Sequence, residues 1–259
     1  MTSDGIAIPA INALRRNFSV VVITKPDMPS GRHKVLMPNE IAKYCAASYI
    51  THFKLDKHDN QFDSLLEQYA PRLGITFSYG VMLSASLLES LTIINIHPSR
   101  LPAFRGPSPI QASIRRGLNI SALTYMLTVM KMDAGPILRY YPFTIGSQDT
   151  YTRVRTVVAN LAGETINEVI NDYLQERIIP IPQDESQTTL CRLLTKQDGL
   201  IDWHQGAEDI FNQWRALLEW PTIYTRVKGK KITLHEIEVL TNDSHLIPGT
   251  FYLYDDKLA

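Results

Sequence analysis

The chain has 259 residues, in which 26 lysines and arginines balance 26 aspartates and glutamates, so its formal net charge is zero. Hydrophobic residues make up 44% and charged residues 20% of the chain, a composition that excludes an intrinsically disordered protein. Zero net charge also excludes a basic surface over the whole molecule, so any contact with nucleic acid must be local.

Compartment and metal content follow from a few further features. No stretch reaches the roughly 20 apolar residues that a membrane helix needs, and the first residues lack the pattern of a signal peptide. The two cysteines, Cys45 and Cys191, are far apart and match no metal-binding spacing. We therefore expect free thiols, no bound metal and a cytoplasmic protein that works away from membranes.

In chain order, strand-like and helix-like segments alternate. Residues 18–24 are a β-branched run typical of a strand buried on both faces of a parallel sheet. Residues 39–47 have helical periodicity, residues 73–80 and 91–97 are strand-like, and a short helix is predicted between these two strands. The alternation predicts a Rossmann-like α/β fold with a mostly parallel sheet and flanking helices.

The second half of the chain continues this pattern and then changes. A helix is predicted to begin at Pro109 and to end at Gly117, residues 121–129 are strand-like, and residues 149–176 have the periodicity of one long amphipathic helix. A polar stretch with two prolines follows, and the segments beyond it are typical of a small, incomplete, barrel-like β-rich domain. The predicted division is a catalytic domain over residues 1–177, a linker over 178–195 and a C-terminal domain over 196–259.

The strand at residues 91–97 ends on two polar side chains, in the stretch INIHPSRLPAFRGPSPIQ. Asn95 and His97 are two positions apart and so point to the same face, at the edge where open α/β sheets bind ligands. A third polar residue, Asp133 in MDAGPIL, follows His97 by 36 positions (133 − 97 = 36). Taken singly, His97 suits a hydrogen-bonded histidine at a strand end, and Asp133 suits a turn.

Taken together, the three residue types suit acyl transfer to an amine. Attack on a carbonyl-type carbon creates an oxyanion, which an asparagine amide and an imidazolium can both stabilise as hydrogen-bond donors. A carboxylate beside the histidine orients it and helps to take the proton from the incoming amine. An α-amine, whose ordinary pKa is near ~7.7–8.0, is already a nucleophile at neutral pH, so no serine or cysteine nucleophile is needed.

The loop INIHPSRLPAFRGPSPIQ and the downstream MDAGPIL resemble the formyltransferases that use 10-formyltetrahydrofolate, whose shared pattern is Asn-x-His-x-Ser-x-Leu-Pro followed by Asp-x-Gly. The resemblance implies that Asn95, His97 and Asp133 form the catalytic set, with 10-formyltetrahydrofolate as the formyl donor and no metal. It also implies that folate contacts Tyr79, Gly80, Met82, Leu83, Ser99, Arg100, Leu101, Pro102 and Gly106. Arg100 stands where the family usually has an apolar residue, and it could instead meet the glutamate tail of the folate.

The resemblance extends along nearly the whole chain to the methionyl-tRNA formyltransferase branch of this family. TKPDMPSGRHKVLMPNEIAKYC resembles the loop with which that branch enters the tRNA acceptor arm. This implies that tRNA contacts Lys25, Arg32, His33 and Lys34. The residues themselves agree, because basic side chains clustered among prolines and a glycine bind phosphates with salt-dependent affinity. A solvated surface loop is the alternative.

The leading hypothesis is therefore formyl transfer from 10-formyltetrahydrofolate to the α-amino group of methionyl initiator tRNA, for translation initiation, by a monomer. One alternative is a sugar-nucleotide N-formyltransferase, which would share the three site residues without needing the basic loop. Another is a non-catalytic folate- or RNA-binding relic. That alternative arises because the chain begins near the end of the family's first strand and stops before the family's β-barrel would be complete.

Overall fold

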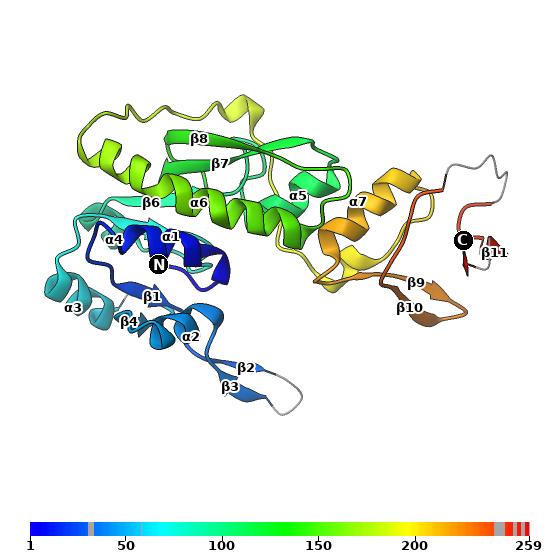
Figure 1. Cartoon of the computed structure of the whole chain (residues 1–259), viewed down its shortest axis with the longest axis horizontal. Coiled ribbons are helices and arrows are strands. Elements are labelled where there is room, and N and C mark those ends of the chain that lie inside the picture. Colours follow the sequence, from blue (N-terminus) through cyan, green and yellow to red (C-terminus); the bar gives the residue numbers. More distant parts are fainter. Residues whose placement is uncertain (31–33, 58, 241–246, 251–252, 255–256, 259) are drawn as a thin grey trace.

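The computed structural model describes residues 1–30, 34–57, 59–240, 247–250, 253–254 and 257–258 (Figure 1). The helices are α1 (Ile8–Leu14), α2 (Glu40–Ala47), α3 (Asn60–Tyr69), α4 (Ala85–Ser90), α5 (Pro109–Arg115), α6 (Tyr151–Leu174) and α7 (Ala207–Leu217). The strands are β1 (Val22–Thr24), β2 (Met28–Ser30), β3 (Val35–Met37), β4 (His52–Lys54), β5 (Gly74–Thr76), β6 (Ile93–His97), β7 (Ile120–Leu127), β8 (Ile137–Thr144), β9 (Ile223–Val227), β10 (Lys230–Leu234), β11 (Leu253–Tyr254) and β12 (Lys257–Leu258).

We call the part of the chain up to the end of α6 the N-terminal unit and the part from α7 onward the C-terminal unit. A four-stranded sheet in the order β5–β6–β7–β8 forms the centre of the N-terminal unit. β5 and β6 are parallel, as are β1 and β4 in a separate pair, whereas β7 and β8 run antiparallel to their neighbours. The predicted α/β class is confirmed. The sheet is mixed because β7 runs antiparallel to β6. β8 then returns antiparallel to β7 through a loop, residues 128–136, in place of the crossover helix that a parallel pair would need.

The first residues of the chain join the β1–β4 pair to the four-stranded sheet. Thr2 N donates to Ile23 O of β1 at 3.0 Å, and Phe77 N, just after β5, donates to Met1 O at 3.2 Å. The amino group of Met1 donates to Ile75 O of β5 at 2.7 Å. Residues 1–2 therefore occupy the place between β1 and β5 that a neighbouring strand would fill.

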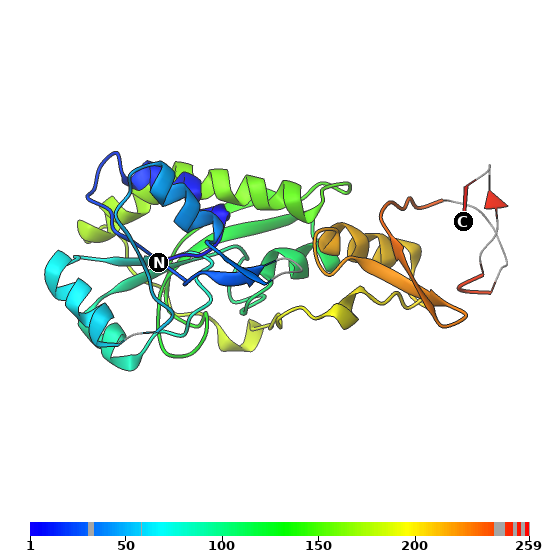
Figure 2. The ribbon, with the colours of Figure 1, turned by 90° about the horizontal axis from the view of Figure 1, so that it is seen from below.

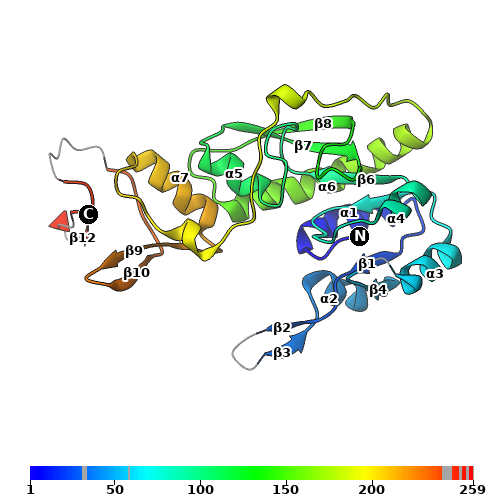
Figure 3. The ribbon, with the colours of Figure 1, turned by 180° about the vertical axis from the view of Figure 1, so that it is seen from behind.

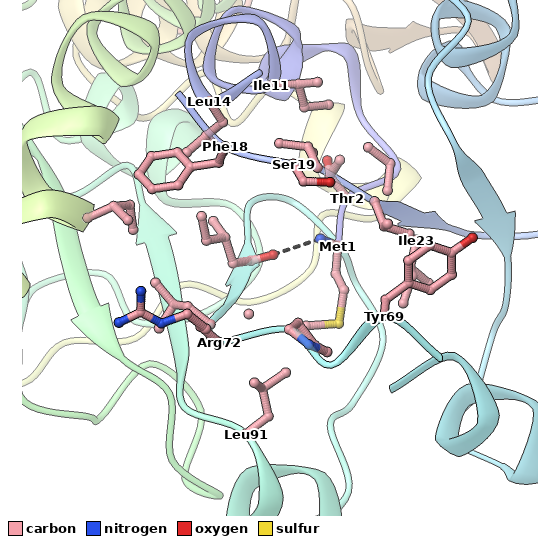
Figure 4. A pocket seen from close by; sticks show the side chains of 18 of the residues that line it. Met1, Thr2, Ile11, Leu14, Phe18, Ser19, Ile23, Tyr69, Arg72 and Leu91 are labelled. Carbon is pink, nitrogen blue, oxygen red and sulfur yellow. Dashed lines mark hydrogen bonds between the residues drawn. The ribbon is translucent and has the colours of Figure 1, made fainter. Parts of the chain in front are cut away.

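A cavity of about 450 Å³ lies beside this junction (Figure 4). Its lining is mainly apolar and includes Ile11 and Leu14 of α1, Leu65 of α3 and Phe18. The strand predicted over residues 18–24 forms only at its end, as β1, because the earlier residues face this cavity in place of a neighbouring strand.

Helix α6 is the main cover of the sheet. It packs on β7 and β8 and runs along α1. Its buried positions recur with helical spacing: Val154, Val158, Ala162, Ile166, Val169 and Ile170. Gly163 permits the close approach of α1, because a Cβ at this position would lie 2.8 Å from Pro9 Cβ. The long helix predicted over residues 149–176 thus supplies one wall of the core.

The C-terminal unit lies at one end of the molecule (Figure 2). α7 packs against α5, and β9 and β10 form an antiparallel hairpin beside it. The segment between α6 and α7, which includes the predicted linker at residues 178–195, runs along the N-terminal unit past β7 and β8 before it reaches α7 (Figure 3). No helix in the described part of the chain has the length and apolarity that would let it cross a membrane.

Candidate active site

Strand β6 presents Asn95 and His97 together, as its two-residue period requires, while Ile94 and Ile96 enter the core. Its parallel neighbour β5 places Thr76 opposite Asn95. The Thr76 hydroxyl donates to Asn95 Oδ1 at 2.9 Å. This contact fixes the orientation of the amide, so that its Nδ2 points away from β5 and serves as a donor.

Asp133 completes the cluster from the loop between β7 and β8. Asn95 Nδ2 donates to Asp133 Oδ1 at 3.1 Å, and Gly106 N donates to Asp133 Oδ2 at 2.8 Å. His97 Nδ1 lies 3.6 Å from the same Oδ2. The structure therefore brings Asn95 and His97 to the carboxylate of Asp133, although 36 positions separate the histidine from the aspartate (133 − 97 = 36).

His97 is 4% exposed, and its two ring nitrogens face different acceptors. Nε2 lies 2.9 Å from Phe104 O, and because a carbonyl only accepts, Nε2 must carry the hydrogen. Nδ1 faces the Asp133 carboxylate at a distance longer than a hydrogen bond. Nε2–H is therefore committed to Phe104 O. In a doubly protonated ring, Nδ1–H would face Asp133 without a short hydrogen bond and would be available to a bound group.

The loop after β6 closes tightly around the cluster. Ser99 is fully buried and its hydroxyl donates to Ala103 O at 2.6 Å, while the peptide bond between Leu101 and Pro102 is cis. Gly106 has a φ of +125°, and a Cβ there would lie 2.0 Å from Cys191 O. Only glycine fits this position, and its amide is the one that reaches Asp133.

The residues predicted to contact folate are divided between this loop and the segment after β5. Gly80 and Met82 are exposed, but Tyr79 is buried in an apolar cluster and its hydroxyl donates to Leu55 O. Burial raises the pKa of Tyr79 to about 12. Arg100 is exposed, with its guanidinium 5.9 Å from the centroid of the Tyr140 ring. Leu83 is half-buried beside Met82.

The residues predicted to contact tRNA lie on or before the β2–β3 hairpin, which projects from the N-terminal unit (Figures 1 and 3). Lys34 is exposed next to β3, and Arg32 and His33 lie outside the described residues. Lys25 precedes the hairpin, and its amine is 2.8 Å from where a Cβ on Gly80 would be. Lys25, a predicted tRNA contact, therefore lies next to Gly80, a predicted folate contact.

Two contributions to the site escaped the sequence analysis. Thr76 orients Asn95, and pairing the strand at residues 73–80 with the strand at 91–97 could have found it. Gln183 lies in the predicted linker, yet its side-chain amide donates to Asp133 O at 2.9 Å. No pattern in the sequence marks Gln183, because its contact spans 50 positions.

Neither the thiols nor the acidic groups offer a metal site in the described part of the chain, where no cluster of three potential ligands is found. Cys45 and Cys191 are free and buried. Burial raises the pKa of Cys191 to about 11, so this thiol is un-ionised at neutral pH. Its hydrogen is donated to Phe104 O, the carbonyl that also holds His97.

Two family models match the chain. The model described as formyl transferase matches residues 8–170, and the model described as formyl transferase, C-terminal domain, matches residues 193–259. A methionyl-tRNA formyltransferase of Borrelia duttonii (strain Ly) is 34% identical over 261 residues, covering 99% of this chain and 81% of the relative. One of Listeria monocytogenes serotype 4a (strain HCC23) is 31% identical over 241 residues, covering 91% and 77%.

Solved structures share the fold at lower identity. An N-formyltransferase from Helicobacter canadensis, in complex with folinic acid and dTDP-3-aminofucose, has a TM-score of 0.72 at 16% identity and covers 99% of this chain and 92% of that one. HypX from Aquifex aeolicus, in complex with tetrahydrofolic acid, has a TM-score of 0.61 at 19% identity and covers 89% and 40%. With matches over both units and relatives above 30% identity, the chain belongs to the formyl transferase family.

Proposed function

We propose that the chain transfers the formyl group of 10-formyltetrahydrofolate to the α-amino group of methionyl initiator tRNA, a step of translation initiation. The convergence of Asn95, His97 and Asp133 at the end of β6 carries the proposal. The choice of methionyl-tRNA rests on the 34% identity to a methionyl-tRNA formyltransferase over 99% of the chain.

The three side chains divide the chemistry of formyl transfer. The Asn95 amide has two N–H groups, of which one is donated to Asp133, and the second can stabilise the oxyanion that forms as the amine attacks the formyl carbon. Protonated His97 offers Nδ1–H to the same oxyanion. Asp133 accepts the proton that leaves the amine and relays it to N10 of the folate as the bond from N10 to the formyl carbon breaks.

The surroundings of the cluster suit both substrates. The exposed parts of the segment Tyr79–Leu83 and of the loop Ser99–Gly106 form the proposed folate contacts, with Arg100 facing the glutamate tail. The initiator tRNA would lie across Lys25, the β2–β3 hairpin with Arg32, His33 and Lys34, and the C-terminal unit. The reaction takes place in the cytoplasm on a monomer.

A second candidate is formyl transfer to an amino-sugar nucleotide. The observation in its favour is the TM-score of 0.72 to an N-formyltransferase whose structure contains dTDP-3-aminofucose. Such a substrate has a single diphosphate group and no acceptor arm. It would leave the projecting hairpin without a role, which is why we favour tRNA.

Formyl transfer by the 259-residue chain, supplied with 10-formyltetrahydrofolate and charged initiator methionyl-tRNA, is the direct test. We expect N-formylmethionyl-tRNA to accumulate, and His97→Ala to lower turnover by a factor of about 10² to 10⁴ in a folded protein. Turnover with a dTDP-amino sugar alone would favour the second candidate. Folate binding without transfer to either amine would identify a non-catalytic relic.

A further inference from the structure

The segment that follows α6 is built into the site. We call residues 181–191 the strap. At its beginning, Ile181 pairs with Ile137 through two backbone hydrogen bonds of 2.7 and 2.8 Å. At its end, Arg105 N donates to Thr189 O at 3.0 Å and Cys191 N donates to Arg105 O at 2.8 Å. The strap therefore joins the start of β8, directly after the loop that carries Asp133, to the loop that follows His97.

Gln183 stands at the centre of the strap and uses its whole side-chain amide. Nε2 donates to Asp133 O at 2.9 Å and to Gly135 O at 2.7 Å. Oε1 accepts from Arg105 Nε at 3.0 Å and from Arg105 Nη2 at 2.8 Å. This orientation of the amide is chemically required, because the guanidinium has only donors and the two carbonyls have only acceptors.

Gln183 bonds to a stretch of backbone whose conformation is unfavourable for most residues. Asp133 has a φ of +49°, in the left-handed region that disfavours residues with a Cβ. Gly135 packs so closely on the end of β7 that a Cβ there would lie 1.7 Å from Leu127 O. The two hydrogen bonds from Gln183 grip the carbonyls of these two residues, and the carboxylate of the first is where Asn95, His97 and Gly106 meet.

An ionic contact anchors the strap at the same place. The Arg105 side chain is only 2% exposed, and its Nη2 lies 2.9 Å from Glu185 Oε1. Lys131, on the loop that bears Asp133, lies 2.6 Å from Glu185 Oε2. These two cations, Arg105 foremost, lower the pKa of Glu185 to about 2, so the anchor stays charged over the working range of pH.

We propose that Gln183 is a positioning residue for formyl transfer: its amide holds the backbone of Asp133 so that the carboxylate stays within reach of Asn95, His97 and the incoming amine. The inference rests on the proposed function of this cluster and extends it to the segment between the two units. The segment does more than connect them, because it fixes the geometry of the reaction.

Two substitutions distinguish the donor role of the amide from its acceptor role. Gln183→Met keeps the shape and loses every hydrogen bond. Gln183→Glu still accepts from Arg105 but cannot donate to the two carbonyls. We expect both variants to lower kcat for methionyl-tRNA by about 10- to 100-fold, since a displaced catalytic group costs this much, with the KM for 10-formyltetrahydrofolate within about twofold of the parent. The control is Gln187→Met, which should leave both constants unchanged, because among the described residues Gln187 Nε2 donates only to Asp184, in the strap itself.

A spectroscopic signature tests the same inference without any turnover. The Gly106 amide donates to Asp133 Oδ2, so its proton resonance reports where the carboxylate lies. Labelling with ¹⁵N-glycine gives 13 amide signals for the chain. We expect the Gly106 signal to move in Gln183→Met and Gln183→Glu, and to stay in place in Gln187→Met. If Gln183→Met does not fold, Gln183→Glu remains the test, because it keeps the buried Arg105 paired.

The outcomes distinguish this inference from the proposed function. An unmoved Gly106 signal together with a kcat within twofold of the parent would overturn the positioning role. A kcat preserved in Gln183→Glu alone would also overturn it, because the contact to Arg105 would then suffice. A moved signal in a chain that formylates no methionyl-tRNA would refute the proposed function and still support the role of Gln183 in holding Asp133.

Discussion

At the scale of single residues, one carboxylate organises the site. Asp133 accepts hydrogen bonds from Asn95 and from the Gly106 amide on its two oxygens, and His97 lies beside it. Asn95 and His97 come from β6, Gly106 from the loop that follows this strand, and Asp133 from the loop between β7 and β8. The proposed chemistry therefore depends on a single side chain whose position is set by its neighbours.

Asp133→Asn tests this dependence. One of its two carboxylate oxygens becomes an NH₂ group, which is a donor set against the Asn95 or Gly106 N–H that this oxygen now accepts, and the negative charge beside His97 disappears. We expect kcat/KM for formyl transfer to fall by a factor of about 10² to 10⁴ in a protein with an unchanged circular dichroism spectrum. Asp149→Asn is the control, because Asp149 accepts from the Gly146 amide at 2.8 Å in a turn away from the site. A loss smaller than tenfold would contradict a proton-transfer role for Asp133.

Gly106 is the second residue on which the site depends. Gly106→Ala would place a methyl group against Cys191 O in a backbone conformation that suits glycine alone. We expect a loss of more than about 2 kcal/mol in the free energy of unfolding, measured with urea, along with the loss of formyl transfer. Gly229→Ala is the comparison, because Gly229 has a φ of +78° but nothing within 4 Å of the added methyl group, so it should lose only about 1 kcal/mol. Equal losses in the two variants would show that φ, and not the contact with Cys191, sets the cost.

At the scale of elements, the β2–β3 hairpin is the part of the molecule that we propose to contact tRNA. Met28 and Leu36 are each 64% exposed, so the hairpin presents apolar as well as basic side chains to the solvent. The basic residues of this segment were predicted from the sequence, and the exposed apolar side chains were not. Exposed apolar groups rimmed by basic residues are typical of a binding surface.

Lys34→Ala tests whether the hairpin meets phosphates. We expect the KM for methionyl-tRNA to rise and the slope of log K against log salt concentration to become shallower by about 0.7 to 0.9, the share of one phosphate contact. The KM for 10-formyltetrahydrofolate should not change. Lys57→Ala is the control, because the Lys57 side chain is 72% exposed and, among the residues that the structure describes, forms an ion pair only with Asp59. An unaltered salt slope in Lys34→Ala would place the tRNA elsewhere.

At the scale of the whole molecule, the sheet consists of two parts that meet at the first residues. The amino group of Met1 is buried at this junction, and burial lowers its pKa from 8.0 to about 5. The unfolded chain therefore binds a proton between pH 5 and pH 8 that the folded chain does not. The free energy of unfolding must rise with pH across this range and fall again as the pH drops towards 5.

The full effect of the Met1 amine approaches roughly 4 kcal/mol, since each unit of pKa is worth about 1.4 kcal/mol. Urea denaturation between pH 5.5 and pH 8.5 measures it, with the N-terminally acetylated chain as the control, because an acetylated amine does not titrate. We expect the acetylated chain to lose this part of the pH dependence. Parallel curves for the two proteins would show that the amine reaches water in the folded state.

Much of the fold and of the candidate site could be predicted because the signals are local. The spacing of two between Asn95 and His97 predicts a shared face as soon as a strand is assigned, and the helical period of residues 149–176 predicts α6. Tyr79 shows the limit of local signals. The family resemblance implies a folate contact at this position, but only the packed structure shows that an apolar cluster buries the ring.

The sequence by itself determined the alternation of strands and helices, the family, and the three polar residues of the candidate site. Periodicity and motifs can be recognised in the order of residues along the chain without knowledge of how the elements pack. Tertiary structure decided which strand edges meet, so that residues 1–2 lie between β1 and β5 and β7 returns antiparallel to β6. It also decided that Gln183 reaches Asp133 across 50 positions. Such contacts depend on how packed elements place distant residues, and local sequence does not encode that placement.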